Sequence, residues 1–250
     1  KTYVINNEPN GTNINTDCGS THIEKLQAFV KEKGLDVGFA FDGDADRCLA
    51  VDENGNLVDG DFLIAICAND MMKNGKLKKN TAVGTVMTNM GFSKFCEANG
   101  IDFVSTKVGD RYVLESMLQN GYNIGGEQSG HIIFLDHSTT GDGELSGAML
   151  LSIMKRTGEK LSDLAKIMER YPQVLINVKV SNEGKLSFYT DKEVKAEINR
   201  VTEILGDTGR ILVRVSGTEP LVRVMLEGEN LEQIQTLAEE AAQVVRERLA

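Results

Sequence analysis

The sequence predicts an α/β protein with a mixed, mostly parallel sheet, followed by a smaller α+β module. Two observations carry this prediction. Between residues 61 and 170, short apolar runs with strand character alternate with segments of helical periodicity, a pattern typical of βαβ units. At Tyr171-Pro172-Gln173 a proline interrupts the helical pattern, and a different order of elements follows, so we expect a domain boundary there.

The segment 1–60 holds few elements for an independent domain, and we expect it to complete a domain whose earlier part precedes it. The chain opens with Lys1 rather than methionine and shows no apolar leader. Asn54-Gly55 favours a two-residue hairpin turn. The elements expected here are strands at 2–6, 37–41, 48–52 and 57–58, and a helix at 21–33.

Residues 61–172 are expected to form one α/β domain, with ligand-binding loops at the carboxyl ends of its parallel strands. Residues 173–250 are expected to form a compact α+β module. The first region is predicted to contain helices at 61–74, 91–99, 110–120, 142–156 and 161–170, and strands at 81–87, 101–106, 122–126 and 131–135. The second is predicted to contain strands at 174–180, 210–215 and 221–227, helices at 191–205 and 230–248, and a loop at 216–220.

The composition indicates a globular chain without a membrane span. Of its 250 residues 41% are hydrophobic, and no apolar run approaches the 18 residues that a span requires. The net charge of −10 disfavours a nucleic-acid surface but leaves room for local phosphate pockets. Four cysteines show neither a CxxC pair nor a zinc spacing, which favours reduced thiols and a cytoplasmic location.

The run DGDADR at residues 42–47 is the strongest chemical signal. Asp42, Asp44 and Asp46 form a candidate site for a hard cation, and Arg47 beside them can hold an anion. Alternate residues of a flat strand lie about 6.6 Å apart, whereas oxygens that share one Mg²⁺ must lie much closer together. The segment is therefore expected to curl, and the small residues between the aspartates leave room for that.

Two other interpretations compete for this run. An EF-hand loop would use the same aspartates with Glu53 at its twelfth position. It fails because Arg47 stands where that loop needs glycine, and because the flanking segments read as strands. A solvated acidic turn stays open until other motifs are considered.

A glycine-rich loop, GGEQSGH at residues 125–131, lies between two expected strands. Its glycines allow close backbone approach, while Glu127, Ser129 and His131 offer an acceptor, a hydroxyl and an imidazole. This set suits sugar hydroxyls, although an ordinary turn favours the same residue types. His22 and His137 read as surface and loop residues, which leaves His131 as the histidine suited to proton transfer.

Two further loops carry basic residues. RVSGTEP at residues 214–220 joins two expected strands, and its hydroxyls, backbone N–H groups and arginine can converge on a phosphate. A polar β-turn with exposed arginines is the alternative. In KVGDR at residues 107–111, the acidic residue Asp110 favours a helix cap, and the basic ones are candidates for contact with a phosphate or leaving group. The candidate contacts are Lys107, Arg111, Arg214, Ser216, Gly217, Thr218 and Arg223.

These loops together resemble those of the α-D-phosphohexomutase superfamily, in order and in spacing, over nearly the whole chain. Three short runs look more like the glucosamine branch than the mannose/glucose branch. They are TNIN at 12–15, CGSTH at 18–22 and STTGDG at 138–143.

The resemblance implies mixed, mostly parallel α/β phosphohexomutase domains, with the end of domain 2 at 1–60 and domain 3 at 61–172, followed by a small α+β (TBP-like) domain 4 at 173–250. It implies interconversion of glucosamine 6-phosphate and glucosamine 1-phosphate, feeding UDP-N-acetylglucosamine and cell-wall synthesis. The phosphoryl group passes from a phosphoserine through glucosamine 1,6-bisphosphate, with Mg²⁺ as cofactor. Such catalysis works by positioning and charge neutralisation.

The resemblance also implies a role for each loop. Asp42, Asp44 and Asp46 bind Mg²⁺, and Arg47 steadies the phosphoserine or the transferring phosphoryl group. Glu127 and Ser129 bind sugar hydroxyls, and His131 is the general acid or base. The phosphate that does not react is held by Arg214, Ser216, Gly217 and Thr218.

One departure from the family pattern concerns the phosphoserine, which lies in a Thr-Arg-x-Ser-Gly-type motif of an N-terminal domain. No such motif occurs here, because ELSG at 144–147 lacks the preceding pair and reads as helix. We therefore expect a C-terminal portion that is inactive without its phosphoserine domain. Phosphomannomutase or phosphoglucomutase activity and a non-catalytic sugar-phosphate-binding module stay open, as do sugar specificity and a homodimer.

Overall fold

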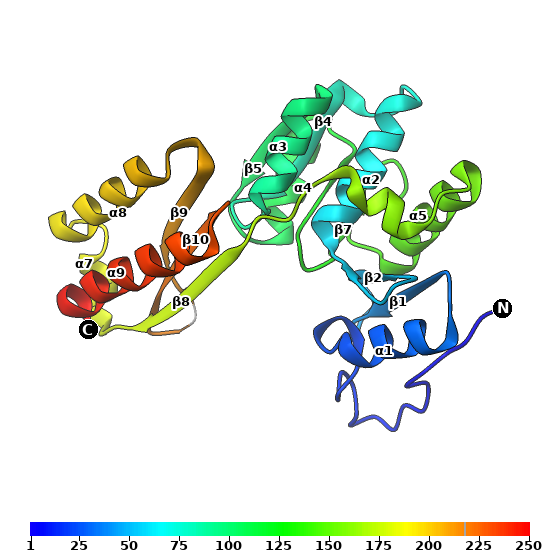
Figure 1. The fold of residues 1–250 in the computed structure, drawn as a ribbon, viewed down its shortest axis with the longest axis horizontal. Helices are drawn as coiled ribbons and strands as arrows, with labels where there is room; N and C mark the ends of the chain where they lie inside the picture. The colour runs from blue at the N-terminus through cyan, green and yellow to red at the C-terminus, as the bar shows by residue number, and fades with distance from the viewer. Residues whose placement is uncertain (218) are drawn as a thin grey trace. The chain divides into compact units, whose positions relative to one another are not determined.

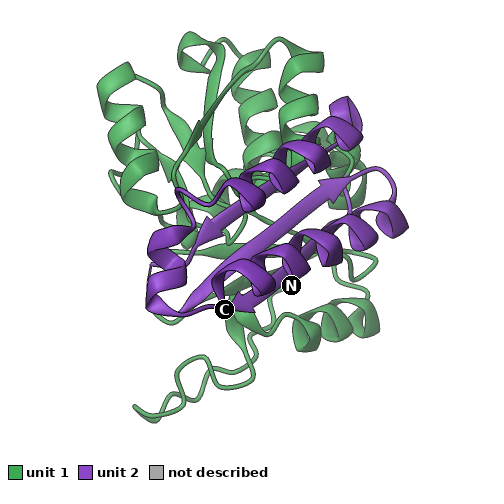
Figure 2. Ribbon diagram, turned by 90° about the vertical axis from the view of Figure 1, so that its left-hand side faces the viewer, with its two compact units in different colours: residues 1–169 green, residues 170–250 purple. Residues whose placement is uncertain are grey.

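The computed structural model describes residues 1–217 and 219–250. These residues divide into two compact units, Lys1–Glu169 and Arg170–Ala250, which Figure 2 colours separately. No helix among the described residues is long and apolar enough to cross a membrane.

The first sheet of unit 1 carries the loop at 42–47. Its strands are antiparallel in the order β1 (Val37–Phe41), β2 (Cys48–Asp52) and β3 (Leu57–Val58), and α1 (Glu24–Lys33) packs on β1 and β2. Since Phe41 pairs with Cys48, the six residues between them must leave the sheet as a tight loop.

Two expectations for this region are wrong. Residues 2–6 form no strand in the described structure, because no neighbouring strand pairs with them and an unpaired strand is not stable in water. The hairpin between β2 and β3 is present, but its turn has three residues, since Asp52 N–H donates to the Asn56 carbonyl at 2.9 Å. Gly55 adopts a φ of +85°, which suits the left-handed position of a three-residue loop.

The second sheet of unit 1 is mixed and mostly parallel, as predicted (Figure 1). β4 is parallel to both β5 and β6, and only β7 is antiparallel. The helices α2 and α3 pack on one face and α4 on the other, while α5 packs on α2. The bounds are α2 (Gly60–Lys73), β4 (Thr81–Thr85), α3 (Met90–Asn99), β5 (Asp102–Thr106), α4 (Asp110–Asn120), β6 (Ile124–Gly126), β7 (Ile132–Phe134) and α5 (Gly143–Thr157).

The hydrophobic core of unit 1 explains this layering. Successive strand residues point to opposite faces, so Ala82 joins the cluster under α2 whereas Val83 joins the cluster under α4. The helix predicted at 161–170 is shorter, because a single α-turn gives way to 3₁₀ geometry. The short elements are η1 (Gly19–Thr21), η2 (Lys78–Asn80), α6 (Leu161–Leu164) and η3 (Ala165–Ile167).

Unit 2 is the α+β module that the sequence predicts. Its antiparallel strands lie in the order β8 (Gln173–Lys179), β10 (Leu221–Gly228) and β9 (Gly209–Val215). The helices α8 (Lys192–Leu205) and α9 (Leu231–Leu249) share a core with one face of this sheet. A 3₁₀ turn, η4 (Gly206–Thr208), follows α8.

One helix of unit 2 was not predicted. α7 (Asn182–Ser187) is six residues long and contains a glycine, so its helical signal is weak. Its start is fixed by Ser181, whose Oγ accepts a hydrogen bond from Gly184 N–H at 2.9 Å. A Cβ atom on Gly184 would lie 1.9 Å from the Leu249 carbonyl oxygen, so the glycine permits close packing on α9.

Candidate functional site

The loop between β1 and β2 brings three carboxylates together. Asp42, Asp44 and Asp46 each offer an oxygen, and these oxygens lie within 4.8 Å of one another. Oxygens around a single Mg²⁺ at about 2.0–2.1 Å lie roughly 3–4 Å apart, so a small closure of the loop suffices. Three carboxylates this close repel by roughly 3–4 kcal/mol per pair at an effective dielectric near 20. Both the donor type and the charge fit a divalent cation.

The loop curls as predicted, at a backbone cost. Ala45 has a φ of +58°, a left-handed conformation that costs a non-glycine residue about 1–2 kcal/mol. Its N–H donates to the Asp42 carbonyl at 3.1 Å, and its own carbonyl accepts from Gly143 N–H at 2.9 Å. Arg47 N–H donates to Asp42 Oδ1 at 3.2 Å. The surrounding structure therefore fixes the carboxylates in a strained turn, as is common at functional sites.

Arg47 stands beside these carboxylates without a close hydrogen bond to them from its side chain. Its Nε lies 3.6 Å from Asp42 Oδ2 and 3.9 Å from Asp46 Oδ1, and this buried Nε makes no hydrogen bond among the described residues. The side chain is 42% exposed. The guanidinium can therefore turn towards an anion that arrives next to the carboxylates.

The glycine-rich loop between β6 and β7 is attached to the aspartate loop through the backbone. Arg47 and His131 form an antiparallel bridge, and Cys48 N–H donates to the Gly130 carbonyl at 3.0 Å. A Cβ atom on Gly130 would lie 2.4 Å from the Cys48 carbonyl oxygen, and one on Gly60 would lie 2.1 Å from that of Glu127. Because these two glycines have no side chain, neighbouring backbone can approach them closely. The two loops therefore form one assembly.

Glu127 links this assembly to the loop at 107–111. Its Oε1 accepts a hydrogen bond from Gly109 N–H at 3.1 Å. Ser129 is exposed. The structure therefore brings three of the predicted loops together in unit 1, namely those at 42–47, 107–111 and 125–131.

The basic residues of the loop at 107–111 are exposed. Arg111 Nε donates to Glu115 Oε1 at 3.1 Å, and Lys107 Nζ lies 5.8 Å from the centre of the Tyr112 ring. The cap expected from Asp110 is wrong, because Gly109 is the N-cap of α4 and no side chain caps the helix. Asp110 is instead an acidic first-turn residue, where its charge favours the helix dipole.

His131 is buried between the two loops. Its Nδ1 lies 2.9 Å from Asp46 Oδ2, and its Nε2 accepts a hydrogen bond from Gly141 N–H at 3.1 Å. His22 and His137 are exposed. His131 therefore contacts the aspartate loop directly, through Asp46.

Two rejected or discounted assignments can be followed in the structure. Glu53, the residue an EF-hand would need, accepts a hydrogen bond from Ser162 Oγ at 2.6 Å and so serves the start of α6. Ser146 lies in α5, as the helical reading of 144–147 predicts, and its buried Oγ donates to the Asp142 carbonyl at 2.8 Å.

Next to the aspartate loop, burial raises the pKa of the Cys48 thiol to about 12.

The residues at 141–143 were not recognised as part of the site. Gly141 contacts the imidazole of His131, Gly143 bonds to the aspartate loop, and Asp142 caps α5 by accepting from Leu145 N–H at 2.9 Å. The sequence signal is the GDG run before an apolar helix, which combines an N-cap with two positions that admit close backbone contact.

In unit 2 the loop between β9 and β10 carries the predicted phosphate residues, of which Thr218 lies outside the described part. Arg214 and Arg223 are directly opposite each other in the β9–β10 ladder, so their side chains emerge on the same face. Burial, and then the charge of Arg223, hold the pKa of Arg214 below its usual value. An anion bound between Arg214 and Arg223 would offset the desolvation of the Arg214 charge and its repulsion from Arg223.

The tip of this hairpin uses its polar groups locally. Ser216 is buried, and its Oγ accepts a hydrogen bond from Glu219 N–H at 3.3 Å. Arg223 Nη2 donates to Glu219 Oε2 at 2.7 Å. A Cβ atom on Gly217 would meet nothing within 4 Å, so this glycine faces open space.

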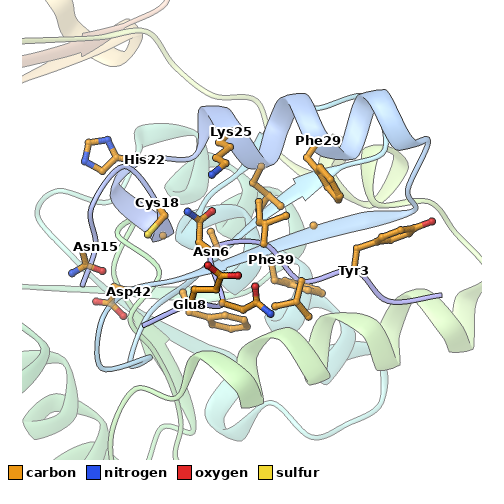
Figure 3. Close-up of a pocket in the computed structure, with 18 of the residues that line it drawn as sticks. Tyr3, Asn6, Glu8, Asn15, Cys18, His22, Lys25, Phe29, Phe39 and Asp42 are labelled. Carbon is orange, nitrogen blue, oxygen red and sulfur yellow. The ribbon is translucent and has the colours of Figure 1, made fainter. Parts of the chain in front are cut away.

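A cavity of about 1260 Å³ lies between the irregular N-terminal segment, α1 and β1. Tyr3 and Phe29 lie at one end of it and Asn15 and Asp42 at the other (Figure 3). Because Asp42 lines its wall, the cavity reaches the aspartate loop.

Models of one protein family match three consecutive segments of the chain. Domain II of the phosphoglucomutase/phosphomannomutase family, described as alpha/beta/alpha, matches residues 3–55. Its alpha/beta/alpha domain III matches residues 59–171, and its C-terminal domain matches residues 175–244.

Curated relatives are similar over nearly all of the chain. Proteins named phosphoglucosamine mutase from Clostridium tetani and Acetivibrio thermocellus are each 58% identical over 246 residues, which is 98% of this chain and 55% of theirs. The chain therefore spans about half the length of these relatives.

Solved structures share the fold at lower identity. One is the Aspergillus fumigatus N-acetylphosphoglucosamine mutase in complex with GlcNAc-6P and magnesium, with a TM-score of 0.77 and 23% identity over 94% of this chain and 54% of that chain. Another is a Burkholderia thailandensis phosphoglucomutase/phosphomannomutase family protein, with a TM-score of 0.73 and 22% identity over 93% and 52%. With three consecutive domain matches and this fold, the chain belongs to the phosphoglucomutase/phosphomannomutase family of the α-D-phosphohexomutase superfamily.

Proposed function

We propose that this chain is the metal- and sugar-phosphate-binding part of a phosphoglucosamine mutase. The whole enzyme would interconvert glucosamine 6-phosphate and glucosamine 1-phosphate in the cytoplasm, through glucosamine 1,6-bisphosphate. The observation that carries the proposal is the close set of Asp42, Asp44 and Asp46, joined through the backbone to a loop that suits sugar hydroxyls. The names of the curated relatives support the choice of sugar.

The proposed roles follow from what each side chain can reach. Asp42, Asp44 and Asp46 would hold Mg²⁺, which when bound neutralises charge on a phosphoryl group. Arg47, Lys107 and Arg111 would bind the reacting phosphoryl group, and Glu127 and Ser129 would orient the sugar ring. The opposite phosphate would be held by Arg214, Ser216, Gly217, Thr218 and Arg223.

The domain organisation is part of the proposal. Residues 1–60 would complete domain 2, residues 61–172 would form domain 3 and residues 173–250 domain 4. The phosphoserine would come from a further N-terminal domain, because Ser146 is buried within α5 and cannot reach a substrate.

The experiment is a coupled assay of the full-length protein on glucosamine 6-phosphate, mannose 6-phosphate and glucose 6-phosphate. We expect glucosamine 6-phosphate to give the highest kcat/KM. A site built to bind one polar substituent rejects an analogue that lacks it by a large factor. Preference for mannose or glucose 6-phosphate would favour phosphomannomutase or phosphoglucomutase activity instead. No turnover on any of the three, with binding retained, would favour a non-catalytic sugar-phosphate-binding module.

A further inference from the structure

We propose that Glu219 competes with phosphate for Arg223, so that a phosphate bound at the β9–β10 loop must displace the Glu219 carboxylate. The inference rests on the phosphate site of the proposed function, which includes Arg223 and assigns no role to Glu219. Three observations support it: the ion pair between these two residues, the unused bonding capacity of the arginine, and the hydrogen bonds that hold the backbone of Glu219 in place.

The side chain of Arg223 keeps an unused donor beside its ion pair. Its Nη2 donates to Glu219 Oε2 at 2.7 Å. Its Nε is buried, and none of the residues that the structure describes accepts a hydrogen bond from it. A guanidinium has five N–H donors and commonly binds a carboxylate or a phosphate through two of them at once. Glu219 therefore occupies Arg223 without saturating it.

A second cation lies on the same face of the sheet. Arg214 is directly opposite Arg223 in the β9–β10 ladder, where like charges repel. Burial, and then the charge of Arg223, lower the pKa of Arg214, so the repulsion persists although Glu219 pairs with Arg223. The Glu219 side chain is 51% exposed and carries one negative charge. A phosphate dianion brings more charge and enough oxygens for both arginines, so it can take the place of the carboxylate.

The backbone of Glu219 is held in place, which keeps the carboxylate nearby after it is displaced. Its N–H donates to Ser216 Oγ at 3.3 Å. Its carbonyl accepts hydrogen bonds from Leu221 N–H at 2.8 Å and from Lys185 Nζ at 3.0 Å. A displaced carboxylate therefore stays within reach of Arg223, and it competes as a group tethered at high effective concentration.

This competition lowers the affinity for phosphate and stabilises the empty site. Without phosphate, Glu219 supplies a counter-charge to two opposed arginines. When phosphate binds, the ion pair breaks and the released carboxylate repels the phosphate at short range. Removal of the charge at Glu219 should therefore strengthen phosphate binding. If Glu219 instead oriented Arg223 for phosphate, removal of its charge would weaken binding, so the sign of the change decides between the two roles.

Binding of inorganic phosphate to the 250-residue chain tests the proposal, followed by amide shifts in the β9–β10 loop at constant pH and ionic strength. Glu219→Gln keeps the size of the side chain and should bind phosphate about 3–10-fold more tightly than wild type, since a weak ion pair and a short-range repulsion are both removed. Glu203→Gln, at an exposed position of α8, changes the net charge equally and should bind as wild type does. In an Arg223→Ala background the gain from Glu219→Gln should shrink, because the ion pair that phosphate must break is absent.

The outcomes separate this inference from the proposed function. If wild type binds phosphate at the β9–β10 loop and Glu219→Gln binds it equally or more weakly, the competition is wrong and the phosphate site stands. Equal gains in Glu219→Gln and Glu203→Gln would indicate an effect of net charge and would also overturn the inference. If neither wild type nor Glu219→Gln binds phosphate at this loop, the proposed phosphate site and this inference both fail.

A second measurement uses wild type alone. The ¹³C shift of the Glu219 side-chain carboxyl group should move as phosphate is added, with the same midpoint as the amides of the loop, because its ion pair with Arg223 breaks. A carboxyl shift that stays constant while the amides move would mean that the ion pair survives in the complex. That result would overturn the proposal even if Glu219→Gln failed to fold.

Discussion

The aspartate and glycine-rich loops of unit 1 and the β9–β10 loop of unit 2 look alike in sequence, since each sets glycines and polar residues at a strand end. They differ in how the surrounding structure holds them in place. The first two are joined by a strand bridge and backbone hydrogen bonds, at glycines such as Gly130 that touch neighbouring backbone. The tip of the β9–β10 loop instead bonds mainly within itself, through Ser216 and Glu219, and Gly217 meets open space.

Under the proposed function, this difference indicates which loop would work by preorganisation. Groups that stabilise charge during phosphoryl transfer are most effective when they need no rearrangement. The strained turn at Ala45 already holds the aspartate loop in a curled conformation. A loop that only grips a distal phosphate can gain its affinity from charge. Arg214 and Arg223 stand directly opposite each other. Although Glu219 pairs with Arg223, the charge of Arg223 still lowers the pKa of Arg214, so a bound anion would be attracted to both arginines.

The largest expected effect concerns the whole chain. The 250-residue chain should show no mutase activity, even with Mg²⁺ and glucosamine 1,6-bisphosphate. In the proposed function its preorganised loops would neutralise charge and orient the sugar, but none of them would supply a phosphoryl carrier in line with the aspartates, as transfer requires. The measurement is conversion of glucosamine 6-phosphate against a boiled control, with the full-length protein as positive control. Turnover above the boiled control would show that preorganisation in unit 1 suffices.

The next effect tests the charge-driven loop. The core of unit 2 comes entirely from residues 174–249, so residues 170–250 should fold alone. In this unit Arg214→Ala should weaken phosphate binding by about 1.5–3 kcal/mol, the usual worth of a charged hydrogen bond. Amide shifts on adding phosphate should centre on the β9–β10 loop. The exposed Arg246→Ala on α9 is the control, and shifts centred elsewhere would mean an ordinary turn.

A pair of glycine variants compares the two regions directly. Gly130→Ala should destabilise the chain by about 1–3 kcal/mol, because Gly130 has a φ of +96° and its Cβ would meet the Cys48 carbonyl oxygen at 2.4 Å. Gly217→Ala should change the free energy of unfolding by less than about 0.5 kcal/mol. Denaturant unfolding of both variants measures the difference. Equal effects would mean that the two loops are supported alike.

The sequence was sufficient for the fold class and for the curl of the candidate metal loop. Alternation of strands and helices predicted the mostly parallel sheet, and alternating aspartates predicted the curled loop. It was insufficient where a contact joins distant segments, as between Gly141, His131 and Asp46. Local propensity gives no information on which backbone N–H will reach a ring nitrogen.

The other misses have the same cause. The run at 2–6 has strand propensity but no partner among the described strands. Asp110 has the residue type of a cap, yet the positive φ of Gly109 moves the helix start by one residue. Each depends on how the chain is placed in three dimensions, which the residue types alone leave open.

The smallest expected effect concerns the reactivity of the cysteine thiols in the folded chain. Burial raises the pKa of Cys48, Cys67 and Cys96 to about 12, so the reactive thiolate amounts to only about 10⁻⁴ of each at pH 8 and grows as pH rises towards that value. A disulfide reagent at pH 8 should therefore modify the half-buried Cys18 alone, and all four thiols in guanidinium chloride.

This labelling also reports how tightly the loops of unit 1 pack. Cys48 lies under the glycine-rich loop, with its N–H bonded to the Gly130 carbonyl. Gly130→Ala should therefore speed modification of Cys48 while Cys67, within α2, stays protected. Gly217→Ala, in the other unit, should leave every rate as in wild type. Mass spectrometry of timed samples identifies the modified cysteine, and protection of Cys48 in both variants would show that its burial does not depend on the contact between the two loops.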